Sequence, residues 1–294
     1  MYEKVDQCPA CSGTEFTNQI ICDDHTVTGE SFVIVSCNQC NLWITSPRPT
    51  KENLGKYYES DTYISHSNKG NSLVNVIYKM VRTYTMYQKT KLIKSFVSSG
   101  KLIDYGCGTG DFLAACQRKG FEISGIEPND IARQQAIAQT NTAVHPDLDN
   151  LPKNEKVDII TMWHVLEHVP NPKETLKRLR KHLNTGGYLI IAVPNRDSFD
   201  ASNYKEHWAA YDVPRHLFHF NPLNIKYLCK ELKLSYIRTV PQYFDAFYVS
   251  MLSEKYLKSG SSFLKGMLKG LQSNRWASQN DNNYSSLIYV LRKK

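Results

Sequence analysis

Short apolar runs alternate with amphipathic stretches from about residue 100 onward. Runs typical of buried strands lie at 102–105, 121–127, 143–144, 157–163, 188–193 and 234–240. Between them, 130–139, 172–183 and a stretch opened by Asn221 and Pro222 have helical spacing. Strands that alternate with helices predict an α/β fold, in which a parallel sheet carries helices on both faces.

The helix predicted over 172–183 has sequence signals near both of its ends. Pro172 lies near its start, and Leu176, Leu179 and Leu183 share one face. Gly186-Gly187 are expected to stop it. Ahead of the sheet, 71–96 has helical spacing, and we expect this helix to lie against the sheet.

A glycine-rich turn joins the first strand to the next helix. Gly106, Gly108 and Gly110 occupy every second position, and Asp104 stands two residues before the first of them. Glycine lets backbone approach a ligand, and a helix start offers free N–H groups. The third glycine comes one residue too early for a dinucleotide site, and Asp104 would repel a phosphate. The spacing therefore favours a ligand that carries positive charge, although a plain strand-to-helix turn is the simpler alternative.

Acidic and aromatic residues follow the other strands. Because ligands of parallel sheets bind at the carboxyl ends of strands, these residues are expected to share the site of the glycine turn. Glu127 can accept both hydroxyls of a ribose, and Asp147 with Leu148 can bind an adenine ring. The remaining predicted cofactor contacts are Tyr105, Trp163 and His164.

These motifs together resemble the class I S-adenosylmethionine (SAM) methyltransferases over residues 100–195. The resemblance rests on Asp104 to Gly110, Glu127, Asp147-Leu148, and Val157 to Ile160 with the following Leu166-Glu167-His168-Val169. The last motif is similar to methyltransferases of the ubiquinone-biosynthesis type and their relatives that modify sugars and natural products. The resemblance implies SAM as cofactor and a Rossmann-like seven-stranded sheet, with 285–291 as a last, antiparallel strand.

Two pairs of cysteines mark the N-terminal region. Cys8 and Cys11 form one C-x-x-C motif, and Cys37 and Cys40 form a second. Four thiolates at this spacing are typical of a closed, tetrahedral zinc site with a structural role. We therefore predict a zinc ribbon over residues 1–50, with a strand at 31–36. A redox pair and accidental cysteines are the alternatives. A ribbon ahead of this domain resembles bacterial methyltransferases associated with deoxysugars or surface polysaccharides.

A histidine-rich segment follows the fifth strand. Residues 206–220 contain His207, His216 and His219 among aromatic and charged residues. Similar to the P-R-H-L-x-H-F segment of the same methyltransferases, this stretch is expected to rise over the reactive end of the ligand. Methyl transfer to a hydroxyl or a carbon acid needs a base, and histidine suits this role near neutral pH. The catalytic candidates are His216, His219, Tyr211 and His168, although each can equally be a packed structural residue. A divalent metal at Glu167-His168 is disfavoured, because further carboxylates are not evident.

Charge and composition limit the classes of molecule that this protein is expected to bind. The net charge is +8, and residues 251–294 contain eight Lys or Arg and two acids. The apolar stripe of Phe263, Leu264, Met267, Leu268 and Leu271 predicts a basic amphipathic helix that packs on the domain or touches a membrane surface. Residues 1–40 contain one Lys, no Arg and six acids, which argues against a nucleic-acid partner. The N-terminus lacks the pattern of a secretory signal, so we expect a cytoplasmic protein.

The sequence thus predicts a ribbon over 1–50, a connecting helical segment over 51–99, and a methyltransferase domain over 100–294 with insertions at 196–220 and 243–284. In the connecting segment, Tyr63 or His66 could cover the cofactor. The expected activity is methyl transfer from SAM to oxygen or carbon of a small molecule, such as a nucleotide-linked or lipid-linked sugar. Two alternatives are an RNA methyltransferase and a binding module without activity.

Overall fold

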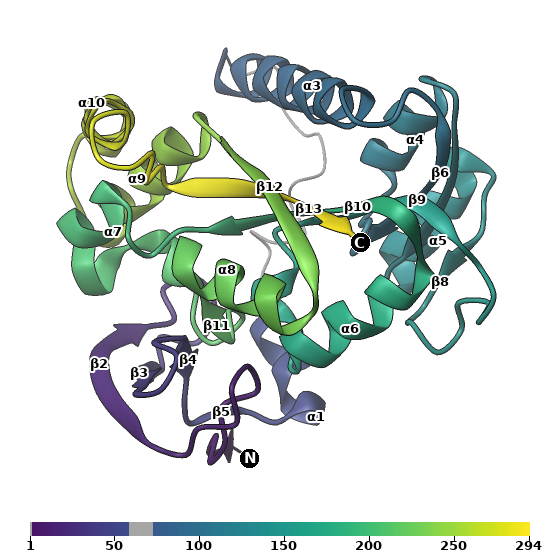
Figure 1. The fold of residues 1–294 in the computed structure, drawn as a ribbon. Coiled ribbons are helices and arrows are strands. Elements are labelled where there is room, and N and C mark those ends of the chain that lie inside the picture. The colour runs from purple at the N-terminus through teal and green to yellow at the C-terminus, as the bar shows by residue number, and fades with distance from the viewer. Residues whose placement is uncertain (1, 59–72) are drawn as a thin grey trace.

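A seven-stranded sheet forms the centre of the molecule in the computed structural model, which describes residues 2–58 and 73–294, and of 73–80 only the backbone (Figure 1). The strand order is β12-β13-β10-β9-β6-β7-β8. The strands are β6 (Gly100–Tyr105), β7 (Phe121–Ile126), β8 (Val144–His145), β9 (Val157–Trp163), β10 (Leu183–Pro194), β12 (Leu234–Pro241) and β13 (Ser286–Lys293). Strands β6 to β10 pair in parallel, and β13 runs antiparallel to both neighbours. The predicted α/β class and the antiparallel last strand are confirmed.

Helices cover the sheet as the alternating pattern predicted. They are α3 (Leu73–Lys94), α4 (Asp111–Gln117), α5 (Asp130–Thr140), α6 (Pro172–His182) and α8 (Pro222–Glu231). The side chain of Asn129 caps α5, and Asn221 forms a reciprocal cap with Asn224 at the start of α8. Tyr63 and His66 lie outside the described residues.

The predicted stop signal of α6 is wrong. The helix ends at His182, and β10 begins at the next residue, Leu183, which is buried and pairs with Val157. Gly186 and Gly187 lie inside β10, where the register with β9 shifts. Burial of Leu183 in the sheet ends the helix earlier than the glycines would.

The N-terminal region folds as a small antiparallel sheet. It contains β2 (Phe16–Asp23), β3 (Ser31–Cys37) and β4 (Trp43–Thr45), and a short pair β1 (Tyr2–Glu3) and β5 (Arg48–Pro49) lies beside it. A fourth strand, β11 (Phe218–His219), completes the sheet next to β4 in the order β11-β4-β3-β2. The helical turns α1 (Lys51–Leu54) and η1 (Gly55–Tyr58) follow the ribbon.

The ribbon shares a hydrophobic core with the larger sheet. Leu42 and Ile44 belong to the same buried cluster as Leu217, Phe220 and Ile225. Asn224 Nδ2 also donates to the backbone carbonyl of Cys40 (3.0 Å), which is one of the four cysteines of the C-x-x-C motifs, called here the knuckle cysteines. The ribbon is therefore packed onto the seven-stranded sheet rather than suspended from a linker.

A helical pair stands at the end of the sheet near β12. Helix α9 (Asp245–Tyr256) packs on α10 (Ser262–Ala277), and Gly266 and Gly270 bring α10 against Met251 and Phe247 of α9. The small residues face inward, so the predicted apolar stripe, including Leu264 and Leu268, lies exposed. Contact of this stripe with a membrane surface stays a prediction. Among the described residues, no helix has the length and hydropathy to span a bilayer.

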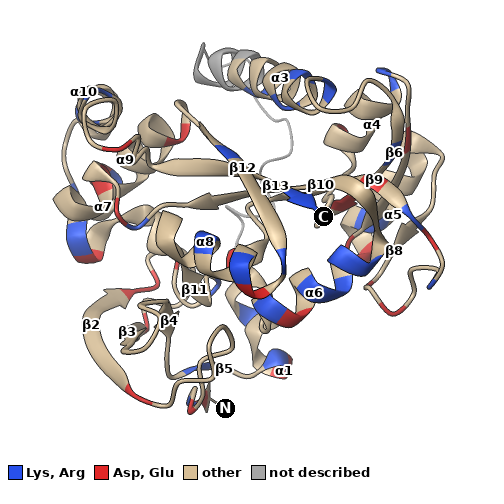
Figure 2. Ribbon diagram, viewed as in Figure 1, with Lys and Arg blue, Asp and Glu red and all other residues tan. Residues whose placement is uncertain are grey.

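Charge is distributed unevenly over the ribbon diagram. Figure 2 shows Lys and Arg on α3 and α6 and at the C-terminal end of β13, whereas acidic residues lie at the two ends of β2. The low basic content of the ribbon does not favour a phosphate backbone as its partner.

Candidate functional site

The glycine turn leaves one open position above the sheet. All three glycines have positive φ, which is +77° at Gly106, +55° at Gly108 and +85° at Gly110. A Cβ on Gly106 would meet Val165 at 2.5 Å, and one on Gly110 would meet Ala136 at 2.9 Å. A Cβ on Gly108 would meet nothing within 4 Å. The outer glycines therefore permit close packing, while Gly108 faces space that a ligand can fill.

Two carboxylates belong to the strand ends around the glycine turn. Glu127 follows β7, and its Oε2 accepts from the backbone N–H of Gly108 (2.8 Å). Asp104 is buried, and Thr161 donates to it across the strand pair (2.6 Å). Burial raises the pKa of Asp104 to about 7, because the charged form loses its hydration. A cationic ligand placed here would favour the ionised form of Asp104.

The predicted adenine contacts lie at the far strand of the site. The Asp147 carboxylate accepts from the backbone N–H groups of Asp149 and Asn150 and from the Asn150 side chain, so it caps its own turn. The hydrogen bonds from Asn150 are the main reason that the pKa of Asp147 lies below its usual value. Leu148 is buried in the core below.

The end of β9 is covered by a lysine that sequence patterns did not single out. Lys89 of α3 places its Nζ 4.4 Å from the centroid of the Trp163 ring. Burial lowers the pKa of Lys89, against the attraction of Asp245 and Asp104. Trp163 packs edge-on against Phe112, the second residue of α4. Helical spacing placed Lys89 on a helix, but only the packing of α3 brings it to the site.

His164 lies between two carboxylates at the same strand end. Its backbone has a positive φ of +56°, its Nδ1 is 3.5 Å from Glu167 Oε1, and its Nε2 is 3.2 Å from Asp245 Oδ2. Burial alone would lower the pKa of His164, but hydrogen bonds and charge from Asp245 and Glu167 raise it to about 9. Asp245 was missed by the sequence analysis, although its place just after β12 at the start of α9 follows the same strand-end rule.

Glu167, His168 and His216 form a buried cluster. One potential ligand atom of each residue lies within 4.8 Å of the other two. Both carboxylate oxygens of Glu167 are buried and accept no hydrogen bond from the described residues. His168 Nδ1 lies 2.9 Å from the Arg215 carbonyl, and burial lowers the pKa of His168 to about 4. Glu167 thus stands between the His164 ring, 3.5 Å from its Oε1, and the neutral His168 ring, and its charge favours protonation of either imidazole.

The remaining residues of the histidine-rich segment face the ribbon. Tyr211 stacks on Trp43 with ring centroids 6.4 Å apart, and the His219 ring lies 3.0 Å from the Thr45 hydroxyl of β4. Burial lowers the pKa of His219 well below its usual value. At these two residues the segment contacts the ribbon, because β11 pairs with β4 of the ribbon sheet, and the position of the segment over the ligand stays a prediction. Their catalytic role stays a prediction, and their contacts are those of structural residues.

A buried arginine links the histidine-rich segment to the ribbon, at a contact that we call the ribbon joint. Arg215 donates to Asp212 and to Asp24, which lies after β2, and its Nη1 donates to the carbonyl of Tyr57. The Arg215 and Asp24 side chains are 1% and 0% exposed. Removal of either partner from such a buried pair leaves the other charge buried without compensation, which lowers the stability of the fold.

The four knuckle cysteines come together as their spacing predicted. The Cys8 and Cys40 sulfurs are 3.6 Å apart, and those of Cys11 and Cys37 are 3.5 Å apart. Tetrahedral zinc with Zn–S bonds of about 2.3 Å separates its sulfurs by about 3.8 Å. All eight cysteines are free of disulfides. The donor set and its spacing fit a zinc ion with four thiolate ligands.

A parallel α/β sheet with a glycine turn, strand-end acids and one antiparallel last strand defines the class of Rossmann-like methyltransferases. A family model described as a methyltransferase domain matches residues 81–238, which is more than half of the chain. The chain therefore belongs to the methyltransferase-domain family.

Curated relatives match a limited part of the chain. The mitochondrial ubiquinone biosynthesis O-methyltransferase of Candida albicans is 31% identical over 111 residues, which cover 34% of each chain. The corresponding protein of Haemophilus ducreyi is 33% identical over 108 residues, covering 33% of this chain and 46% of that one. The alignment thus spans less than half the length of these relatives.

Solved structures agree on the fold. A SAM-dependent methyltransferase of Thermotoga maritima, a possible histamine N-methyltransferase, matches 75% of this chain and 96% of its own with a TM-score of 0.51 and 18% identity. Magnesium protoporphyrin IX methyltransferase of Synechocystis PCC 6803, with bound S-adenosylhomocysteine, matches 81% of this chain and 97% of its own with a TM-score of 0.53 and 13% identity. At these identities the likeness concerns the fold alone.

Proposed function

We propose that this protein is a SAM-dependent methyltransferase that acts on oxygen or carbon of a small molecule, such as a nucleotide-linked or lipid-linked sugar. The observation that carries the proposal is the open space at Gly108, whose backbone N–H donates to Glu127, in a turn that follows the buried Asp104. The names of the matched curated relatives, which are O-methyltransferases, support oxygen as the acceptor atom.

The residues of the turn fit SAM by their chemistry. Gly108 would lie under the cofactor, Glu127 would accept its ribose hydroxyls, and Asp104 would face its positive charge. When bound, SAM supplies a methyl group on a sulfonium, which is a good leaving group. The protein then has to orient the acceptor, exclude water and take a proton.

The buried cluster next to His164 can take that proton. Burial lowers the pKa of His168 to about 4, so its imidazole is neutral but weakly basic near pH 7, and the charge of the adjacent Glu167 would stabilise the imidazolium that forms when it takes the proton. His216 extends the cluster, with its ring edge-on to His168 at 4.6 Å between centroids. We assign His168 with Glu167 as the proton-accepting pair and His216 as its neighbour in the cluster.

A structural zinc ion in the ribbon is a second part of the proposal. Cys8, Cys11, Cys37 and Cys40 leave no position open for substrate in a tetrahedral site, so the ion would hold the ribbon and perform no chemistry. The ribbon would in turn hold β11 and, through it, the segment that carries His216.

The experiment replaces Gly108 with arginine. Gly108→Arg fills the open space, so we expect S-adenosylhomocysteine binding, measured by calorimetry, to weaken at least 100-fold and methyl transfer to be lost. Gly120→Arg is the matched control, because Gly120 also has a positive φ (+89°) and a Cβ on it also meets nothing within 4 Å, but it lies between α4 and β7, at the opposite end of β7 from Glu127. Equal binding by the wild type and Gly108→Arg, with unchanged melting temperature, would show that the cofactor does not bind at Gly108.

Binding without turnover would favour the alternative of a binding module. Salt-sensitive binding of RNA would favour the RNA methyltransferase, since phosphate contacts weaken steeply with salt.

A further inference from the structure

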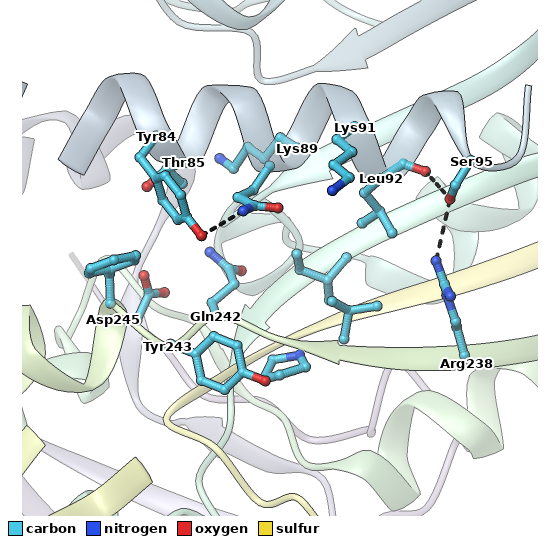
Figure 3. A pocket seen from close by; sticks show the side chains of 15 residues that line it. Tyr84, Thr85, Lys89, Lys91, Leu92, Ser95, Arg238, Gln242, Tyr243 and Asp245 are labelled. Atoms are coloured by element: carbon cyan, nitrogen blue, oxygen red, sulfur yellow. Dashed lines mark hydrogen bonds between the residues drawn. The ribbon is translucent and has the colours of Figure 1, made fainter. Parts of the chain in front are cut away.

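A groove with a cavity of about 460 Å³ lies between α3 and the β12–β13 end of the sheet. Figure 3 shows side chains of α3 pointing down into it and those of β12 and the following loop pointing up. Apolar walls come from Leu92, Val240 and Ile288, and Tyr84 and Phe244 pack edge-on at one end with centroids 5.5 Å apart. A ring or short aliphatic group would fit between them.

Basic side chains gather in this groove. Lys89, Lys91 and Arg238 line it, and none of the three forms an ion pair with a carboxylate in the described part of the chain. The Arg238 guanidinium has only a 3.4 Å hydrogen bond to the Ser95 hydroxyl and a contact with the Phe96 ring at 4.7 Å. Lys91 and Arg238 are exposed, so they stand at the rim of the groove, where two cations next to apolar walls favour a ligand with an anionic group.

The opposite end of the groove has hydrogen-bond acceptors. Asp245 lines that end and holds His164 at the tip of β9. Gln242 points into the cavity, and its Oε1 is buried without a hydrogen bond from any described residue (Figure 3). The Gln242 amide and the Asp245 carboxylate together give this end of the groove polar groups that can exchange hydrogen bonds with a ligand hydroxyl.

We propose that this groove binds the methyl acceptor and that the acceptor carries a phosphate group. The phosphate lies at Arg238 and Lys91, the hydroxyl-bearing part lies at Gln242 and Asp245, and the reactive atom points toward His164. This inference rests on the proposed function and deepens it by giving the acceptor's chemical class. A sugar nucleotide and a phosphorylated lipid share this chemistry.

The test measures binding of two phosphate probes by calorimetry, with the protein saturated with S-adenosylhomocysteine. Uridine diphosphate represents the nucleotide source, and n-octyl phosphate below its micelle concentration represents the lipid source. We expect at least one probe to bind, and we expect Arg238→Gln and Lys91→Gln each to weaken that binding at least fivefold. Octyl glucoside, which lacks the phosphate, should bind at least tenfold more weakly than octyl phosphate if the source is a lipid.

Lys94→Gln is the matched control. Lys94 lies on the same helix and is exposed, but it does not line the groove. Its variant should bind both probes as the wild type does. Binding of uridine diphosphate alone indicates a nucleotide, and binding of octyl phosphate alone indicates a lipid.

The inference is overturned if neither probe binds, or if the Arg238 and Lys91 variants bind as tightly as the Lys94 variant. Failure of the wild type to bind S-adenosylhomocysteine contradicts the proposed function instead, so the two failures are distinguishable.

Discussion

The cofactor turn and the ribbon joint are built in opposite ways. The turn is assembled from neighbours in sequence: a strand, three glycines and the first residue of α4 all lie within 100–111. The joint brings together Asp24, Tyr57 and Arg215, which are separated by up to 191 positions. A local site depends on backbone conformation, whereas a distant one depends on buried side-chain partners and on whatever holds the small sheet together.

The largest expected effect concerns the metal of the ribbon. Cys40→Ser removes one of the four thiolates, so we expect zinc content, measured by atomic absorption, to fall from about one ion per chain to near zero. Structural zinc contributes about 10–16 kcal/mol of binding free energy in isolated finger peptides, so the ribbon should unfold. Cys229→Ser, at a buried cysteine outside the cluster, is the control and should keep its zinc.

Because the cofactor turn is formed by residues that are neighbours in sequence, we expect it to keep its conformation when the ribbon loses its zinc. Calorimetry of Cys40→Ser should find S-adenosylhomocysteine binding within a few-fold of the wild type, while methyl transfer drops. Loss of cofactor binding in proportion to zinc would mean that the two regions fold as one unit.

A smaller effect is expected at the buried arginine. Arg215→Met leaves the Asp24 carboxylate buried without its cation, which should lower the free energy of unfolding by about 3–5 kcal/mol. The measurement is urea unfolding at pH 7. Arg178→Met, which breaks an exposed pair with Asp149, should cost less than about 1 kcal/mol. Similar losses in the two variants would refute the structural importance of the joint.

The smallest effect is a pH dependence at His164, which couples the end of β9 to α9. Its pKa in the folded protein, about 9, lies above the ordinary value of 6.5, so the stabilisation is complete below pH 6.5 and is lost as the pH rises through about 9. We expect His164→Gln to lower the free energy of unfolding by about 1–2 kcal/mol at pH 6 and by much less at pH 10. A difference that grows toward high pH would contradict the ion pairs with Asp245 and Glu167.

The regions also differ in how far the sequence could predict them. The sheet, the glycine turn, Glu127 and the cysteine cluster follow from strand periodicity, glycine spacing and the C-x-x-C rule, because each signal lies within a few residues. The pairing of β11 with β4 left no such signal, since two residues of strand carry no periodicity. Tyr211 and His219 were therefore expected over the ligand rather than against the ribbon.

The groove was missed for the same physical reason. Lys89 and Arg238 lie on elements 149 residues apart, and only the packing of α3 over the edge of the sheet brings both to one cavity. Gln242 and Asp245 follow a strand end, where the rule for parallel sheets could have found them.

The pairing of β11 with β4 also has a consequence during synthesis. The ribosome makes β4 long before its partner strand, and at about 5–20 residues per second the intervening chain takes about 10–35 s to appear. For that time the edge of the ribbon sheet presents unpaired backbone groups that can template contacts with other nascent chains. The short length of β4, three residues, limits that exposure.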